Sequence, residues 1–167
     1  MSVIWITGLA GAGKTTIARE VERLLAAQDI LVTLLDGDAV RKRFGDTAYD
    51  RAGRLAAAYR LSRLAAEISA AGQTVVVATI SLFHEIQSAN RTLHADYLEV
   101  FVQCDAATLQ RRSPLYGRDI DASLVGRGIP AEFPVAPHLV LDSGDASRVD
   151  ALARRIVERW TTNVGIR

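Results

Sequence analysis

The chain has one cysteine, two lysines and four prolines among its 167 residues. A single cysteine excludes an internal disulfide framework and a metal cluster held by several cysteines. The apolar runs are too short to span a bilayer, and no basic segment precedes the first of them, as one does in a secretion signal. We therefore expect a cytoplasmic protein that has no membrane partner.

Neither sign of charge dominates the sequence. Twenty Lys and Arg residues stand against nineteen Asp and Glu residues, which gives a net charge of +1. This balance provides no general electrostatic attraction to nucleic acid, so we predict no nucleic-acid partner. The 49% of hydrophobic and 23% of charged residues are typical of a globular protein, and the length predicts one domain over residues 1–167.

Short apolar runs alternate with segments in which apolar residues recur every three or four positions. This alternation is typical of parallel strands joined by crossover helices, so we predict an α/β protein with a five-stranded parallel sheet and helices on both faces. Gly72 is expected to end the longest helix, and Asp145 or Ser147 to cap the last one. The predicted strands are residues 3–7, 31–36, 74–80, 97–103 and 138–141.

One stretch interrupts this alternation. Residues 113–137 hold all four prolines and three glycines without a clear period. An irregular segment of this length in a compact domain is more often a mobile functional loop than a plain connection. We predict a mobile lid at about residues 113–137, with irregular surface packing as the alternative.

Residues 8–15 match the phosphate-binding pattern G-x-x-x-x-G-K-[ST] and lie between a predicted strand and a predicted helix. Glycines allow backbone N–H groups to turn toward a phosphate, and the helix N-terminus adds the positive end of its dipole. Lys14 would bridge the β- and γ-phosphates of ATP, and the Thr15 hydroxyl would bind Mg²⁺. The residues expected to bind the nucleotide are Gly8, Leu9, Ala10, Gly11, Ala12, Gly13, Lys14, Thr15 and Thr16.

The alternative to a phosphate loop is an ordinary glycine-rich turn. The chain has eighteen arginines and only two lysines, yet a lysine occupies the position where the pattern requires one. A compact ammonium group suits this position better than a fork-shaped guanidinium. The sequence therefore predicts ATP and Mg²⁺ as cofactors.

Two carboxylates follow the second predicted strand. Asp36 and Asp38 are separated by one glycine, and strand ends on the carboxyl side of such a sheet line the ligand crevice. One carboxylate can hold Mg²⁺, and the other can take a proton from an acceptor hydroxyl. The alternative is that Asp38 only caps the following helix. Arg41, one turn further on, is a candidate for contact with a substrate phosphate.

These motifs resemble those of adenylylsulfate (APS) kinases. Residues 5–16 and 35–38 are similar to the family patterns W-[IL]-T-G-L-S-G-[AS]-G-K-[ST]-T and L-D-G-D. The resemblance continues through Ile80-Ser81, residues 98–102, Arg112 and later segments, and it spans nearly the whole chain. It implies a P-loop NTPase fold and a kinase that transfers the γ-phosphoryl group of ATP to the 3′-hydroxyl of adenylylsulfate, a small nucleotide acceptor.

The resemblance also implies roles for individual residues. Asp36 would hold the metal with Thr15, Asp38 would contact the acceptor hydroxyl, and Arg112 would neutralise charge on the transferring phosphoryl group. Ser81 matches a serine sometimes assigned as a phosphorylated intermediate, but direct in-line transfer favours a substrate contact instead. The expected catalytic residues are Lys14, Asp36, Asp38, Ser81 and Arg112. The expected acceptor-binding residues are Asp38, Arg41, Tyr49, Arg54, Arg60, Ile80 and Ser81, with Tyr49 stacking on the base and Phe133 as a further aromatic candidate.

Four departures from the family pattern all lie on the acceptor and lid side. Ala39 and Ala57 stand where the family has Asn, residues 113–116 lack the family's Lys-Gly, and Gly128 stands where the family has Asp. Each lost hydrogen bond to a charged ligand removes about 1 to 3 kcal/mol. The acceptor could therefore be a nucleotide other than adenylylsulfate.

Three functions remain open at this point. The first is phosphorylation of adenylylsulfate. The second is the same chemistry on another acceptor, because residues 83–85 and 125–130 resemble a subgroup that phosphorylates cytidine diphosphoramidate. The third is a nucleotide-binding regulator without turnover. Because members of the family are often dimers, a homodimer is a further expectation, although the sequence locates no interface.

Overall fold

The computed structural model describes residues 2–116 and 122–164, which contain one parallel five-stranded sheet. Its strands are β1 (Val3–Thr7), β2 (Val32–Asp36), β3 (Thr74–Thr79), β4 (Tyr97–Gln103) and β5 (Leu139–Asp142). The order across the sheet is β2-β3-β1-β4-β5, so β1 lies in the centre and pairs with β3 and β4. The predicted α/β class and parallel sheet are confirmed.

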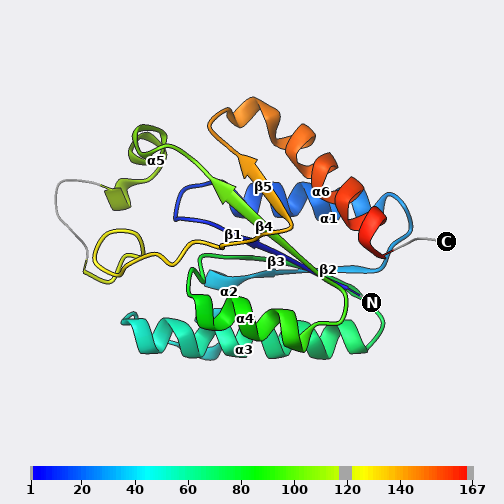
Figure 1. Ribbon diagram of the computed structural model, residues 1–167, viewed down its shortest axis with the longest axis horizontal. Helices are drawn as coiled ribbons and strands as arrows, with labels where there is room; N and C mark the ends of the chain where they lie inside the picture. Colours follow the sequence, from blue (N-terminus) through cyan, green and yellow to red (C-terminus); the bar gives the residue numbers. More distant parts are fainter. Residues whose placement is uncertain (1, 117–121, 165–167) are drawn as a thin grey trace.

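Helices cover both faces of the sheet (Figure 1). They are α1 (Lys14–Ala26), α2 (Gly37–Phe44), α3 (Arg51–Ala70), α4 (His84–Leu93), α5 (Ala106–Arg112) and α6 (Val149–Val164), with short 3-10 helices η1 (Pro114–Tyr116) and η2 (Ala146–Arg148). Helices α1 and α6 pack on one face, and α3 and α4 on the other. Helix α5 lies beyond the carboxyl ends of the strands, and residues 122–137 begin there and run back beside β4 to the start of β5 (Figure 1). Within the described ranges, no helix combines the length and the apolar character needed to cross a membrane.

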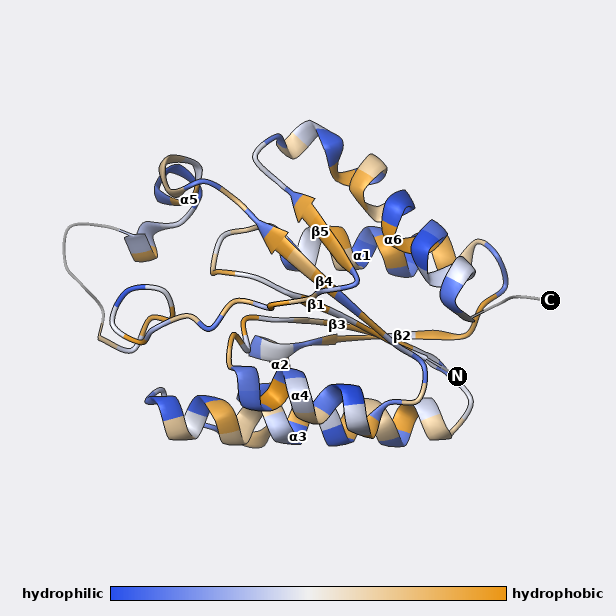
Figure 2. Cartoon of the chain, in the orientation of Figure 1, coloured by the Kyte–Doolittle hydropathy of each residue, from blue (hydrophilic) through white to orange (hydrophobic). Residues whose placement is uncertain are grey.

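The central strand β1 contributes to a hydrophobic core on each face. Ile4 and Ile6 pack with α1 and α6, whereas Val3 and Trp5 pack with α3 and α4. Successive side chains on a strand point to opposite faces, so a strand covered on both sides needs an unbroken apolar run. Figure 2 shows this arrangement as apolar strands between helices whose hydrophilic residues face outward.

The sequence located β1 and β4 to the residue, and the other three strands to within one residue. Strand β5 begins at Leu139, and just before it the ring Nδ1 of His138 accepts a hydrogen bond from the backbone N–H of Glu99, at 2.8 Å. Gly72, with φ of 96°, follows the end of α3 as expected. Asp145 accepts a hydrogen bond from the Ser147 N–H and caps η2, which leads into α6.

The predicted lid is largely irregular. Its first residues form η1, and Val125 and Ile129 form an isolated bridge around a turn. Residues 117–121, which fall inside the predicted lid, lie outside the described residues. The mobility of this segment stays a prediction.

A fully buried carboxylate connects three elements of the fold. Glu99 on β4 accepts a hydrogen bond from Arg91 on α4, and Arg91 also donates to the carbonyl of Ala136 at 3.0 Å. Burial raises the pKa of Glu99 above its usual value, and Arg91 opposes that rise. Arg91 therefore joins α4, β4 and the segment that leads into β5.

Arg91→Ala should lower the free energy of unfolding at pH 7 by about 3 kcal/mol, because Glu99 would be left as a buried charge without its cationic partner and with only a 3.5 Å hydrogen bond from the Tyr97 hydroxyl. Urea unfolding measures this loss, and the loss should shrink at lower pH as Glu99 becomes protonated. Arg154→Ala is the matched control, since Arg154 pairs with Asp150 on the exposed face of α6. The control should lower the free energy of unfolding by less than about 0.5 kcal/mol. Equal losses in the two variants would contradict the role of Arg91 as the partner of buried Glu99.

Candidate active site

The phosphate loop joins the end of β1 to the start of α1. Gly11 and Gly13 have φ values of 77° and 85°, in the left-handed region that glycine adopts without strain. A Cβ atom added to Gly8 would lie 2.3 Å from the carbonyl oxygen of Val102, so β4 leaves room for glycine alone. Because Gly13 occupies the N-cap position, no side chain caps the first turn of α1. The N–H groups of that turn suit an anion.

Lys14 is the first residue of α1 and is 9% exposed. Its Nζ donates a hydrogen bond of 2.7 Å to the carbonyl of Leu9, across the phosphate loop. Burial lowers the pKa of Lys14 to about 8, and the nearby carboxylates of Asp38 and Asp36 oppose this shift. The ammonium group is therefore held where the loop would place the phosphates of a nucleotide.

The Asp36 carboxylate makes two sets of hydrogen bonds, whereas the Asp38 side chain is exposed. The Oδ1 atom of Asp36 accepts from the N–H groups of Asp38 and Ala39, at 3.0 and 3.3 Å, and caps α2. Its Oδ2 atom accepts from the Thr15 hydroxyl at 2.8 Å. The capping role considered for Asp38 therefore belongs to Asp36, because the residue before the first turn makes the cap. Asp38 is exposed in the first turn of α2.

The structure brings together Thr15 and Asp36, the two residues predicted to hold a metal ion. A hydroxyl and a carboxylate are hard oxygen donors of the kind that Mg²⁺ prefers, and Mg²⁺ usually takes only one or two of them from the protein together with substrate phosphates. These two residues fit a magnesium ion at the mouth of the phosphate loop.

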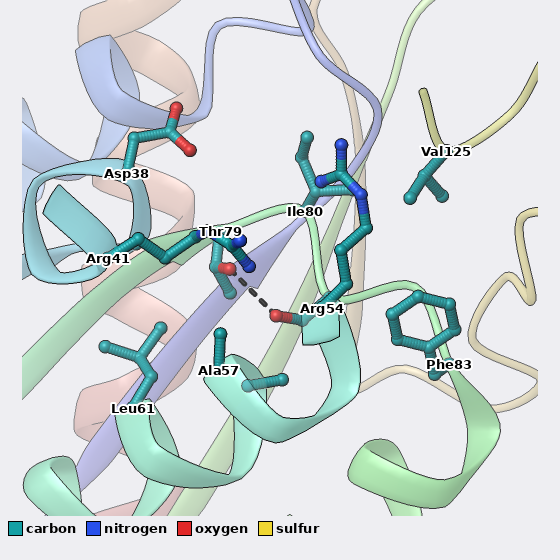
Figure 3. Close-up of a pocket in the computed structure, with 12 residues that line it drawn as sticks. Asp38, Arg41, Arg54, Ala57, Leu61, Thr79, Ile80, Phe83 and Val125 are labelled. Carbon is teal, nitrogen blue, oxygen red and sulfur yellow. Dashed lines mark hydrogen bonds between the residues drawn. The ribbon is translucent and has the colours of Figure 1, made fainter. Parts of the chain in front are cut away.

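Two pockets adjoin at the carboxyl ends of the strands. The phosphate-loop pocket is lined by Ala10, Gly11, Gly13, Lys14, Thr15, Thr16, Asp36, Asp38, Ala78, Thr79, Ile80 and Leu115. The α2–α3 pocket, shown in Figure 3, is lined by Gly37, Asp38, Arg41, Arg54, Ala57, Ala58, Leu61, Thr79, Ile80, Ser81, Phe83 and Val125. Asp38, Thr79 and Ile80 line both pockets. A group bound in one pocket would therefore meet a group bound in the other beside Asp38.

Arg41 and Arg54 form one wall of the α2–α3 pocket and lie against Tyr49, which does not line it. The Arg41 guanidinium lies 4.4 Å from the ring centre of Tyr49, and the Arg54 guanidinium lies 5.4 Å from it. Arg41 also donates to the carbonyl of Ala48 at 2.6 Å, and Arg54 to that of Tyr49 at 3.0 Å. Among the described residues, the buried Nε of Arg41 has no hydrogen-bond partner. This wall presents positive charge and an unused donor beside the pocket.

Ser81 lies at the boundary of the α2–α3 pocket in a strained conformation. Its φ of 32° is unusual for a residue with a side chain, and such strain is concentrated at functional sites. The Ser81 hydroxyl lies 2.8 Å from the hydroxyl of Thr79 (Figure 3). The Thr7 hydroxyl donates to the carbonyl of Ile80 and ties this turn to β1. The turn thus presents two hydroxyls to the pocket.

Four residues predicted for catalysis or acceptor binding line neither pocket: Tyr49, Arg60, Arg112 and Phe133. Arg60 pairs with Asp46 and lies over Phe44, because it follows Arg54 by six residues and points about 120° away from it around α3. The residues of α3 that do line the pocket are Arg54, Ala57, Ala58 and Leu61, which follow helical spacing.

Arg112 and Phe133 are held by separate contacts. Arg112, at the end of α5, donates to the Gly144 carbonyl at 3.0 Å and to Cys104 Sγ at 3.8 Å. The Phe133 ring packs 5.4 Å from that of Phe101 and is 45% exposed. In this structure neither side chain reaches the phosphate loop or the α2–α3 pocket.

Sequence reasoning did not place Thr79, Leu61, Phe83 or Leu115 in the site. Thr79 could have been found, since it ends a strand whose carboxyl end faces the crevice. Leu61 could have been found from its spacing with Arg54. Phe83 precedes α4 and Leu115 lies in η1, and only the tertiary structure determines where these connecting segments lie relative to the sheet.

Comparison with known proteins identifies the family. The family described as adenylylsulphate kinase matches residues 1–142. A cytidine diphosphoramidate kinase of Campylobacter jejuni is 34% identical over 163 residues, covering 94% of this chain and 95% of that protein. An adenylyl-sulfate kinase of Bacillus licheniformis is 38% identical over 155 residues, covering 88% and 79%.

The fold agrees with these relatives. An APS kinase of Mycobacterium tuberculosis, solved in complex with AMPPNP and APS, superimposes with a TM-score of 0.86 at 31% identity, covering 95% of this chain and 96% of that one. With the phosphate loop and the adjoining pockets already in place, these likenesses settle the family. The chain belongs to the adenylylsulphate kinase family of P-loop kinases.

Proposed function

We propose that this kinase transfers the γ-phosphoryl group of ATP to the 3′-hydroxyl of adenylylsulfate. One observation carries the proposal: Asp38 lines both the phosphate-loop pocket and the α2–α3 pocket. A donor phosphate bound to the loop and an acceptor hydroxyl in the second pocket would meet beside this carboxylate. The relatives named adenylyl-sulfate kinases support adenylylsulfate as the acceptor.

The nucleotide side of the reaction uses the phosphate loop. Backbone N–H groups of residues 8–15 would surround the β-phosphate, and Lys14 would leave the Leu9 carbonyl to bridge the β- and γ-phosphates. Thr15 and Asp36 would hold Mg²⁺, which when bound neutralises charge on those phosphates.

The acceptor side uses the α2–α3 pocket. Arg41 and Arg54 would bind the anionic part of the acceptor, and the unpartnered Nε of Arg41 supplies a free donor for it. Tyr49 would stack on the base after the two guanidinium groups shift from its faces. The acceptor oxygen attacks the γ-phosphorus as its proton passes to Asp38, the bond to the β-phosphate oxygen breaks, and ADP leaves.

A role for Arg112 in this reaction requires a change of conformation. Its guanidinium would have to leave Gly144 and Cys104 to reach the transferring group. Arg60 and Phe133 would need comparable movements to touch the acceptor.

A second acceptor is supported by a specific feature of the pocket. Ala57 lines the α2–α3 pocket where the family pattern has an asparagine, so a polar partner for the acceptor is missing there. A relative of similar identity and nearly equal length is named a cytidine diphosphoramidate kinase. Cytidine diphosphoramidate is therefore the second candidate acceptor.

The experiment that tests the proposal measures acceptor-dependent release of ADP from ATP and Mg²⁺, with adenylylsulfate and cytidine diphosphoramidate side by side. We expect a higher kcat/KM with adenylylsulfate. Ala57→Asn is the companion variant and should increase that preference, because it restores an amide to the pocket wall. Turnover with cytidine diphosphoramidate alone would replace the proposed acceptor by the second candidate.

Asp38→Asn should lower kcat by about 10²- to 10⁴-fold because it removes the proton acceptor, and it should change the Kd for ATP far less, through the loss of a carboxylate near Lys14. Steady-state kinetics and calorimetric ATP binding measure the two effects. Asp50→Asn is the matched control, because Asp50 caps α3 through the Gly53 N–H and asparagine caps equally well. Unchanged turnover in Asp38→Asn would exclude this base. A wild-type protein that binds ATP but turns over neither acceptor would support the regulator alternative.

The affinity for ATP should fall as the pH rises through about 8. Lys14 has a pKa of about 8 in the free protein, and bound phosphates stabilise its charged form, so binding is strongest below that pH. The Kd of a non-hydrolysable ATP analogue should rise roughly 5- to 10-fold between pH 7.5 and 9. Lys42→Gln, which alters the exposed lysine on α2, should keep the same dependence. A constant Kd over this range would contradict the role of Lys14.

A further inference from the structure

Glu132 lies in residues 122–137, the part of the predicted lid that leads to β5, which we call the lid segment. Its backbone is hydrogen-bonded to α4 and to the turn before α4. The Glu132 N–H donates to the carbonyl of Leu82 at 3.0 Å. Its own carbonyl accepts from the side chain of Gln87 at 2.7 Å. This part of the lid is therefore attached beside the start of α4.

The carboxylate of Glu132 joins two helices. One oxygen accepts from the backbone N–H of His84 at 2.6 Å, and the other accepts from Arg51 at 3.0 Å. The residue at the N-cap of α4 is Phe83, whose ring cannot accept a hydrogen bond from the first turn. Glu132 supplies from outside the helix the cap that the local sequence lacks. These two donors hold the pKa of Glu132 below its usual value, so the carboxylate is charged.

The two donors to this carboxylate, His84 and Arg51, lie next to residues that line the α2–α3 pocket. Arg51 begins α3, one turn before Arg54, which lines the pocket. The Arg51 guanidinium lies 5.2 Å from the ring centre of Phe83, which also lines the pocket and is 1% exposed. Val125, from the same lid segment as Glu132, completes that side of the pocket (Figure 3).

We propose that Glu132 is a positioning residue for the acceptor, because it fastens the lid segment to α3 and α4 and so sets the distance between Val125, Phe83 and Arg54. This inference rests on the proposed use of the α2–α3 pocket for the acceptor. Glu132 itself lines neither pocket, and it acts through the residues that do.

A second carboxylate provides an internal comparison. Glu85 accepts from the same nitrogen of Arg51 at 2.9 Å, but it belongs to α4 and, among the described residues, makes no hydrogen bond to the lid segment. Both carboxylates pair with Arg51. Of the two, Glu132 is the one that belongs to the segment that carries Val125.

The test compares Glu132→Ala, Glu132→Gln and the control Glu85→Gln in the full chain. For Glu132→Ala we expect the KM for adenylylsulfate to rise about 10-fold, with the KM for ATP nearly unchanged and the midpoint of thermal unfolding lowered by about 2 to 4 °C through the lost helix cap. Glu132→Gln keeps an acceptor for the His84 N–H and loses the ion pair, so its KM should lie between those of the wild type and Glu132→Ala. Glu85→Gln should leave both KM values within twofold of the wild type.

Hydrogen exchange provides a readout that does not depend on turnover. Amides of residues 122–137 and of the first turn of α4 should exchange faster in Glu132→Ala than in the wild type or in Glu85→Gln. The inference is overturned by an unchanged acceptor KM in Glu132→Ala, by an equal rise in the KM for ATP, or by an equal effect in Glu85→Gln. If the wild type did not turn over adenylylsulfate, the proposed function would fail. Unchanged hydrogen exchange in Glu132→Ala would, independently of turnover, contradict the proposal that Glu132 fastens the lid segment to α3 and α4.

Discussion

The parallel direction of the strands places every part of the active site at one edge of the sheet. Carboxyl ends of parallel strands meet at the same edge, so the segments that follow β1, β2 and β3 become neighbours. These segments are the phosphate loop, Asp36 to Asp38, and Thr79 to Ser81. Residues separated by more than sixty positions thus line the same two pockets. Hydrophobic residues on both faces of β1 hold this arrangement in place.

The phosphate loop is supported on both flanks by groups from the later part of the chain. The Tyr116 hydroxyl donates to the carbonyl of Ala10 at 2.8 Å, and the Ser143 hydroxyl donates to that of Ala12 at 2.7 Å. Inside this framework Lys14 keeps its own contact with the Leu9 carbonyl. The loop therefore has a defined shape before a nucleotide arrives, and in the proposed function Lys14 exchanges its internal bond for bonds to phosphate.

The nucleotide side and the acceptor side of the candidate site differ in how many of their residues a local sequence pattern could predict. The phosphate loop is a continuous motif whose glycine conformations and following helix are local properties, and Lys14, Thr15 and Asp36 lie together as expected. The acceptor side gathers residues from α2, α3, the turn after β3 and the lid segment. Of the residues that the resemblance assigned to the acceptor or to catalysis, Arg41, Arg54 and Ser81 line the α2–α3 pocket, whereas Arg60, Arg112 and Phe133 have other partners.

The sequence by itself determined the fold class, the strands to within a residue, the phosphate loop and the carboxylates that face it, because each depends on short-range periodicity or on a contiguous motif. Only the tertiary structure decided that Asp38 lines two pockets and that Phe83 and Val125 line one of them. It also decided that Glu132 replaces the missing cap of α4. Such contacts join residues far apart in the chain, and their partners depend on how helices and loops pack against the sheet, which no local pattern encodes.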